Sequence, residues 1–387
     1  MNKIKITYLI NSMQNGGAEC MLWDVVKHLD HSLFECKIVC LFNANDFPET
    51  PIVHVYSLDF VQKRIHKNPY YLKKIINYFE QNTCDILHTH LCYADYFGHI
   101  IRALNKVPLL YTTIHNTVEW PRKHITVLSL FEDTLIQYVD RIITVSEDMR
   151  RFVINERHCR DNKVVTIYNG IDFSSFRHLE YNRDLIRSKL GIDASELLIV
   201  CTAQFRREKR HDLLIDAFVK LLQIIPNAKL LLLGSNGALK NNIEEIIQKS
   251  RLTDNIIIRS ATREQVPQYL GAADIFTMHS ENEGFGLALI EAVAAGLPIV
   301  VPDLPCFKEI MNEGIDGLFF HFGDTNMQAD KIALTWKNIQ NGNCFWSQSA
   351  KRVLGQFSIE QHVSNLTTLY LKDYEYRINK KNILGGI

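Results

Sequence analysis

The chain has 387 residues, of which 47% are hydrophobic and 22% are charged, and its 43 basic and 43 acidic residues give a formal net charge of zero. This length exceeds one ordinary core and predicts two domains. Balanced charge without a long basic run disfavours a nucleic acid partner. No apolar run reaches the roughly eighteen residues that a membrane-spanning helix needs, so none is expected.

The start of the chain predicts a buried strand rather than a signal peptide. Lys3 and Lys5 precede apolar residues, but Asn11 and Ser12 end the apolar run too early for a secretory signal. The nine cysteines lie among apolar neighbours without paired CxxC spacing, which is typical of reduced core residues. We therefore expect a cytoplasmic protein.

Short apolar runs alternate with amphipathic stretches along almost the whole chain. This alternation predicts an α/β fold with two doubly wound layers, in which helical crossovers join parallel strands. The strands are expected at 4–10, 37–42, 52–56, 86–90, 109–114, 141–145 and 164–168, and then at 197–203, 229–233, 255–259, 275–279, 298–301 and 317–320. Asn169 and Gly170 supply turn chemistry after a strand, so the seam between the domains is expected there.

Two carboxylates, Glu283 and Glu291, stand eight positions apart around a glycine turn and a small-residue stretch. If the segment between them is mostly helical, they lie roughly 12 Å apart along the axis, at 1.5 Å per residue. The glycines allow backbone amides to approach a ligand, and a helix start favours phosphate. A nucleotide sugar fits this spacing, with its hexose at one end, its ribose at the other and its diphosphate between them.

At these residues the chain resembles the retaining glycosyltransferases of family 4, whose signature is a Glu, seven-residue, Glu pattern with an embedded Glu-Gly-Phe-Gly. The resemblance implies the GT-B fold, in which two doubly wound Rossmann-like domains face a central cleft. It implies an acceptor-side domain at 1–172, a donor domain at 173–357 and a C-terminal helix within 358–387 that returns to the first domain. In this family Glu283 would bind the donor sugar, Glu291 the ribose, and the turn the diphosphate, through Gly284, Phe285, Gly286 and Leu287.

Two further positions take donor roles from the resemblance. Gly16 and Gly17 precede a helix after the first strand, where the family's loop closes over the diphosphate; a plain turn is the alternative. The spacing is not the Gly-x-Gly-x-x-Gly of a dinucleotide site, which counts against a dehydrogenase. His115 directly follows the strand at 109–114, and the family has a catalytic His there, beside the donor sugar; a packed or capping His is the alternative.

Basic residues follow the strand at 197–203, where cations neutralise a diphosphate leaving group. Lys209 matches the lysine of the family. Gln204 stands where the family has an Arg, so Arg206 is the candidate replacement, and a solvated basic turn is the alternative. The glycine turn at Gly234 and Gly237 also resembles that of the family.

No Asp-x-Asp motif occurs in the chain, so we expect metal-independent chemistry with no cofactor. His88 and His90 share one face of a strand, but no third metal ligand has suitable spacing, and a structural or acceptor-side role is expected. A stretch without acidic residues interleaves apolar side chains with Lys63, Arg64, Lys67, Lys73 and Lys74. This stretch predicts either peripheral contact with an anionic membrane or a solvated helix face whose other side is in the core.

These features predict a retaining, metal-independent glycosyltransferase. It would move a hexose from a nucleoside diphosphate sugar to a glycan or lipid-linked acceptor, in bacterial surface polysaccharide biosynthesis. One alternative is a non-hydrolysing sugar-nucleotide epimerase of the same fold. Another is a nucleotide-sugar binding protein without turnover.

Overall fold

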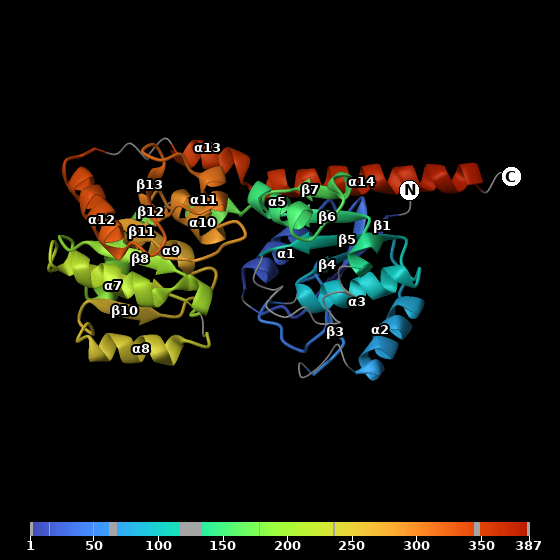
Figure 1. Ribbon diagram of the computed structural model, residues 1–387, viewed down its shortest axis with the longest axis horizontal. Helices are drawn as coiled ribbons and strands as arrows, with labels where there is room; N and C mark the ends of the chain where they lie inside the picture. Colours follow the sequence, from blue (N-terminus) through green and yellow to red (C-terminus); the bar gives the residue numbers. More distant parts are fainter. Residues whose placement is uncertain are drawn as a thin grey trace. The chain divides into compact units, whose positions relative to one another are not determined.

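The computed structural model describes residues 3–384 except 15, 49, 62–67, 117–133, 178, 235–236 and 344–348. The chain divides into two compact units, which are described separately: unit 1 is Met1–Gly170 with Ile359–Ile387, and unit 2 is Ile171–Ser358. In each unit helices flank a sheet whose neighbouring strands pair in parallel (Figure 1). No helix within the described ranges is long and apolar enough to cross a membrane.

The sheet of unit 1 has the strand order β3-β2-β1-β4-β5-β6-β7. The central strands are almost entirely buried, and their sequences are short apolar stretches that include a few polar residues, such as His88 and His90 in β4. The order reverses direction between β1 and β4. The strands are β1 (Ile4–Ile10), β2 (Phe34–Cys40), β3 (Val55–Ser57), β4 (Ile86–His90), β5 (Leu109–Ile114), β6 (Arg141–Thr144) and β7 (Val164–Thr166).

The crossovers of unit 1 are amphipathic helices with one face in the core. In α1, for example, Met21, Leu22, Val25 and Val26 are buried together with the side chains of β1. The helices are α1 (Gly17–His28), α2 (Pro69–Gln81), α3 (Cys92–Ala103), α5 (Glu147–Asn155), α14 (Ile359–Leu384) and the 3-10 turns η2 (Ile136–Tyr138) and η3 (Asp161–Lys163).

The sheet of unit 2 has the strand order β10-β9-β8-β11-β12-β13. Numbered from its own first strand, this is the 3-2-1-4-5-6 order of dinucleotide-binding folds, and it reverses between β8 and β11. The strands are β8 (Leu198–Thr202), β9 (Lys229–Leu233), β10 (Ile256–Arg259), β11 (Ile275–Thr277), β12 (Ile299–Pro302) and β13 (Gly317–Phe320).

The helices of unit 2 alternate with these strands, as crossover connections between parallel strands require. They are α6 (Arg183–Leu190), α7 (His211–Leu222), α8 (Lys240–Lys249), α9 (Val266–Ala272), α10 (Leu287–Ala294), α11 (Pro305–Ile310), α12 (Thr325–Gln340) and α13 (Ser349–Gln356), with 3-10 turns η4 (Phe173–Phe176), η5 (Leu179–Asn182) and η6 (Arg207–Lys209).

Every strand predicted from the sequence is present, which confirms the doubly wound α/β class, although several ends differ. The strand predicted at 37–42 begins at Phe34, because Phe34–Cys36 continue the pairing with Ile4–Ile6. The strand predicted at 52–56 begins only at Val55, where pairing with β2 starts at Ile38. The strand predicted at 275–279 stops at Thr277, and the buried His279 instead bonds to Gln328 and Gly323.

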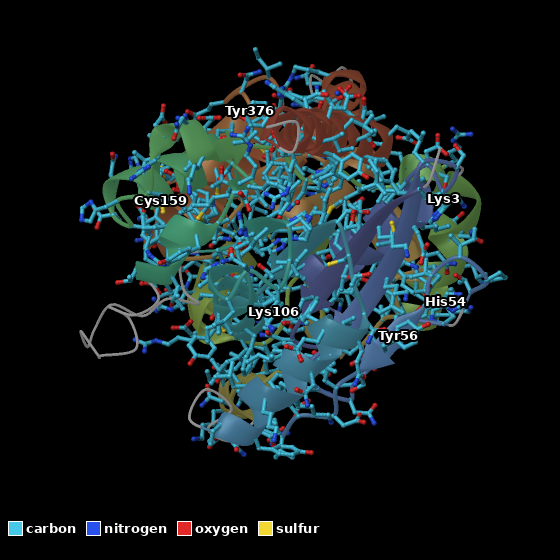
Figure 2. The ribbon with its side chains drawn as sticks, turned by 90° about the vertical axis from the view of Figure 1, so that its right-hand side faces the viewer. Lys3, His54, Tyr56, Lys106, Cys159 and Tyr376 are labelled. Atoms are coloured by element: carbon cyan, nitrogen blue, oxygen red, sulfur yellow. The ribbon has the colours of Figure 1, made fainter. Side chains whose placement is uncertain are left out.

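The last helix, α14, packs within unit 1 and runs to Leu384, inside the range 358–387 expected for it. Its Tyr370 hydroxyl lies 2.5 Å from Nδ1 of His88, and the Asp373 carboxylate accepts two hydrogen bonds from the Arg141 guanidinium, at 2.7 and 2.8 Å. Three residues on, Tyr376 is 70% exposed and lies at the surface in Figure 2. The helix is therefore held by these polar contacts and by its apolar residues in the core of unit 1, which include Ile359, Val363 and Leu366.

The basic stretch coincides partly with α2. Tyr71, Ile75 and Phe79 are buried in the core of unit 1, which favours the solvated-face alternative for this helix. Lys73 is exposed, whereas Nζ of Lys74 donates to the carbonyl of Leu58 at 2.6 Å. Lys74 is thus held by the protein, and Lys63, Arg64 and Lys67 lie outside the described residues.

Candidate functional site

The candidate site of unit 2 lies at the point where its strand order reverses. Lys209 ends η6, the turn that follows β8, and Glu283 lies in the loop that follows β11. β8 and β11 are neighbours in the sheet. Because open α/β sheets bind ligands outside the carboxyl ends of their strands at such a switch point, both side chains lie where a ligand is expected.

Lys209 and Glu283 form an ion pair, with Nζ of the lysine 2.6 Å from Oε1 of the glutamate. The two side chains are 20% and 12% exposed, so the pair is largely shielded from water. The loops that carry them are also tied through the backbone, since the amide of Glu281 donates to the carbonyl of Glu208 at 2.8 Å. The cation predicted for the diphosphate and the carboxylate predicted for the sugar therefore contact each other directly.

The residues after Lys209 hold the lysine in place. Arg210 has a φ of +44°, a conformation that is uncommon for a residue with a side chain, and it caps α7. The ring of the next residue, His211, packs on Phe205 with centroids 4.8 Å apart. Burial, together with the nearby charge of Lys209, lowers the pKa of His211 to about 4. His211 is therefore neutral at pH 7 and supports the turn by packing.

The glycine turn before α10 differs from the helix assumed in the sequence analysis. α10 begins at Leu287, so Glu283–Gly286 is not helical and the premise of the 12 Å spacing is wrong for its first half. Gly286 has a φ of +120°, and a Cβ there would lie 2.7 Å from a ring carbon of Phe307. The N-cap residue of this helix, Gly286, has no side chain that could accept from the first amides, which suits the anion-binding role predicted for them.

The other predicted donor residues of unit 2 differ in exposure. The ring of Phe285 is buried and packs edge-on against Phe357 at 5.4 Å, so only its backbone suits ligand binding. Gly284 is buried, and Glu291, four residues after Leu287 on the same face of α10, is half-buried. Arg206 is exposed at the start of η6. Its role as the replacement cation stays a prediction.

The turn that follows β9 packs on the loop that follows β8. A Cβ at Gly234 would lie 2.1 Å from the carbonyl oxygen of Ala203, and one at Gly237 would lie 2.5 Å from that of Phe205. These contacts with backbone atoms leave no room for a side chain, so the glycine pattern has a packing reason. Ser235 and Asn236, between the two glycines, lie outside the described residues.

In unit 1 the predicted glycine loop follows β1. Gly16 is the N-cap of α1 and Gly17 is its first residue, while Asn15 lies outside the described residues. A Cβ at Gly16 would lie 2.3 Å from Oε2 of Glu19. The sequence analysis did not include Glu19, whose carboxylate lies beside the loop expected to approach a diphosphate. An acidic residue in the first turn of a helix was the available signal.

His115 follows β5 and lies beside His90, with Nε2 of His115 3.0 Å from Nδ1 of His90. His88, on the same face of β4, has other partners: its ring nitrogens bond to the hydroxyls of Tyr370 and Thr113, at 2.5 and 2.7 Å. These contacts favour the structural side of the structural or acceptor-side role expected for the pair, which stays a prediction. His90 contacts the predicted catalytic histidine, which the strand pattern alone did not indicate.

The histidines of this cluster, His88, His90, His115 and His362, are uncharged at pH 7. Burial lowers the pKa of His88 to about 3 and that of His115 to about 4, and it lowers the pKa of His90 well below its usual range. Nδ1 of His362, on α14, bonds to the carbonyl of Tyr168 at 2.7 Å. Across the described residues, no group of three or more His, Cys, Asp or Glu side chains is arranged to hold a metal ion.

Comparison with known proteins identifies the family. The family description "Glycosyltransferase Family 4" matches residues 15–175, and "Glycosyl transferases group 1" matches residues 182–343. The chain belongs to glycosyltransferase family 4. Together the two matches include every residue predicted for the donor site, from Gly16 to Glu291.

Two relatives illustrate the range of this family. The chain is 27% identical over 337 residues to N-acetyl-alpha-D-glucosaminyl L-malate synthase of Bacillus anthracis, covering 83% of this chain and 84% of that protein. It is 23% identical over 300 residues to UDP-Gal:alpha-D-GlcNAc-diphosphoundecaprenol alpha-1,3-galactosyltransferase of Escherichia coli, covering 74% of this chain and 75% of that one. By name, the first relative is a synthase and the second is a galactosyltransferase.

Solved structures share the fold of this chain. Anabaena HepE in complex with UDP and glucose is 18% identical, has a TM-score of 0.81, and the match covers 95% of this chain and 99% of HepE. Sucrose-phosphate synthase of Thermosynechococcus elongatus is also 18% identical, with a TM-score of 0.83 and coverage of 96% and 100%. The family 4 chain described here therefore has the GT-B fold, with one Rossmann-like domain in each unit.

Proposed function

We propose that this glycosyltransferase is a retaining, metal-independent hexosyltransferase that uses a nucleoside diphosphate sugar. The observation that carries the proposal is the Lys209–Glu283 pair at the switch point of unit 2, beside the uncapped start of α10. A cation and a helix start suit a diphosphate, and a carboxylate suits sugar hydroxyls. A nucleotide sugar is one ligand that contains both a diphosphate and sugar hydroxyls.

UDP-sugars are the proposed donors. Structures of HepE contain UDP, UDP with glucose, and UDP-glucose, and the galactosyltransferase relative is named for UDP-Gal. In the proposed complex Lys209 and the amides of Phe285 and Gly286 bind the diphosphate, and the diphosphate role of Gly16 and Gly17 in unit 1 stays a prediction. Glu283 binds sugar hydroxyls and Glu291 binds the ribose, while Arg206 is the proposed second cation.

The proposed reaction breaks the bond between the sugar C1 and the diphosphate oxygen, and the electron pair of that bond leaves with the diphosphate. The acceptor hydroxyl oxygen forms the new bond to C1 from the same face, and its proton passes to an oxygen of the departing phosphate. Cations and backbone amides stabilise the charge that develops on the leaving group. His115, neutral at pH 7, is proposed to donate a hydrogen bond to the sugar.

A glycan or lipid-linked acceptor is proposed, in the synthesis of a bacterial surface polysaccharide. Relatives named for a diphosphoundecaprenol acceptor and for lipopolysaccharide core biosynthesis support this class. A cytoplasmic location is proposed as well. The eight cysteines in the described part of the chain are free thiols, as is usual in a reducing compartment.

The test is incubation of the full chain with UDP-sugars and other nucleotide sugars, each with and without lipid-linked diphosphate or oligosaccharide acceptors. Mass spectrometry of the products should show an acceptor heavier by one hexose, with release of nucleoside diphosphate. Conversion of the donor to its epimer without an acceptor would favour the epimerase alternative. Donor binding with neither transfer nor slow hydrolysis would favour a binding protein.

A further inference from the structure

His90 has one side-chain hydrogen bond within the described chain, and it leads to His115. It is the last residue of β4 and is 6% exposed. Its Nδ1 lies 3.0 Å from Nε2 of His115, with ring centroids 5.3 Å apart. Its other ring nitrogen, Nε2, is buried and has no hydrogen-bond partner in the described residues. Its ring also packs on that of His88, with centroids 4.4 Å apart, so it is the hydrogen bonding of His90 that favours an action through His115.

The unpartnered nitrogen indicates where the protons lie. A hydrogen bond between two neutral imidazoles needs one N–H and one bare nitrogen. If His115 donated, His90 would accept at Nδ1 and would carry its own proton on Nε2, leaving a buried N–H without an acceptor. Orphaned buried N–H groups are rarer than under-satisfied acceptors. The favoured arrangement has Nδ1–H of His90 donating to Nε2 of His115, which leaves the proton of His115 on Nδ1.

We propose that His90 is a positioning residue for sugar transfer: its Nδ1–H holds the ring of His115 so that Nδ1–H of His115 donates to the donor sugar. This inference rests on the proposed function. It also assigns different roles to the two histidines of β4. His88 is 1% exposed on the same strand face, and its ring nitrogens bond to Tyr370 and Thr113 rather than to His115.

The first test needs no substitution at His90. In the full chain labelled with ¹⁵N-histidine at pH 7, long-range proton–nitrogen spectra distinguish the two tautomers of each ring. A His115→Asn variant assigns the His115 signals by their loss. We expect the proton of His115 on Nδ1 and its Nε2 bare. A His115 ring that carries its proton on Nε2 would overturn the inference.

The second test compares variants at the two strand positions. His90→Asn keeps an N–H near the place of Nδ1 and has no atom in place of the unpartnered Nε2, so it should preserve the His115 tautomer and most of kcat. His90→Leu removes the donor, so His115 should populate both tautomers, and kcat should fall about tenfold with little change in the KM for the acceptor. His88→Leu is the matched control and should leave the His115 tautomer unchanged.

The outcomes separate this inference from the proposed function. Equal effects of His90→Leu and His88→Leu on the tautomer would indicate a merely structural histidine and would overturn the inference. Failure of His90→Asn to preserve the tautomer that the wild type shows would do the same. The predicted tautomers in a protein that transfers no sugar would support the hydrogen-bond assignment and overturn the proposed function.

Discussion

The ion pair between Lys209 and Glu283 predicts opposite effects of the two residues on nucleoside diphosphate binding. At 2.6 Å, and with side chains 20% and 12% exposed, the carboxylate neutralises much of the lysine charge before any ligand arrives. Glu283→Gln should therefore leave UDP binding intact or tighten it two- to tenfold, since an anion near the diphosphate is removed; this corresponds to about 0.4–1.4 kcal/mol.

Lys209→Met should do the reverse. Hydrogen bonds to charged groups contribute about 1.5–3 kcal/mol, so loss of this cation should weaken UDP binding about 10- to 150-fold. Both variants should lower turnover, although their effects on UDP binding are opposite. Glu283→Gln should lower kcat by about 10²-fold or more, because a contact aimed at the transition state is lost.

Isothermal titration calorimetry with UDP at pH 7 measures these affinities. Lys220→Met is the control, because it removes another cation of unit 2, one that pairs with Asp216 at 3.1 Å, and it should leave the affinity within threefold. Raising the salt concentration should reduce the difference in UDP affinity between Glu283→Gln and the wild type. If Glu283→Gln weakened UDP binding as much as Lys209→Met does, or turned over normally, the reasoning would be refuted.

Four further predictions follow from particular residues. As the pH falls from 6.5 to 4.5, unit 1 should lose about 1.4 kcal/mol of unfolding free energy per pH unit for each buried neutral histidine. The reason is that these histidines bind protons in the unfolded chain but stay neutral in the folded one, where the pKa values of His88, His99 and His115 are about 3, 3 and 4. Hydrogen exchange corrected for intrinsic rates should show a larger loss in unit 1 than in unit 2, and an equal loss would contradict the prediction. Gly286→Ala should destabilise unit 2 by about 1–3 kcal/mol in thermal unfolding, more than Gly296→Ala, whose Cβ meets no atom within 4 Å; equal losses would remove the packing argument. Transfer should survive a chelator, and loss that manganese or magnesium restores would reopen a metal role for the histidines. Since the packing of α2 favours a solvated face, the protein should sediment equally with anionic and neutral vesicles, and changing Lys63, Arg64, Lys67 and Lys73 to Ser should have no effect; salt-sensitive binding to anionic vesicles that these changes weaken would favour the membrane alternative.

The strands could be predicted from the sequence because parallel strands covered on both faces are short, mostly apolar runs between amphipathic stretches. β1, β4, β5, β9 and β13 begin and end where those runs do. Other strand ends differ from the predicted ones where backbone pairing, rather than hydrophobicity, sets the boundary, as at Phe34 in β2. α10 begins at Leu287, after the glycines, as expected, but the positive φ of Gly286 keeps Glu283–Gly286 out of the helix, so the 12 Å spacing does not apply.

The candidate site could be predicted only in part, since its residues are distant in the sequence. Lys209 and Glu283 are 74 positions apart, and nothing in either motif indicated that they pair. Tyr370 lies 282 positions from His88, so the role of α14 in holding the histidine cluster required the tertiary structure. Glu19 was missed because the glycine loop was interpreted through its backbone alone.

The most direct test of the central claim is the configuration of the product at its anomeric carbon. The reaction of an α-linked UDP-hexose with an active acceptor is followed by proton NMR. The coupling constant of the anomeric proton then gives the configuration of the newly formed glycoside before any side reaction. The account predicts an α-linked product, formed in step with release of UDP and about 10²-fold more slowly or worse by Glu283→Gln. A β-linked product, or an unimpaired Glu283→Gln enzyme, would contradict it.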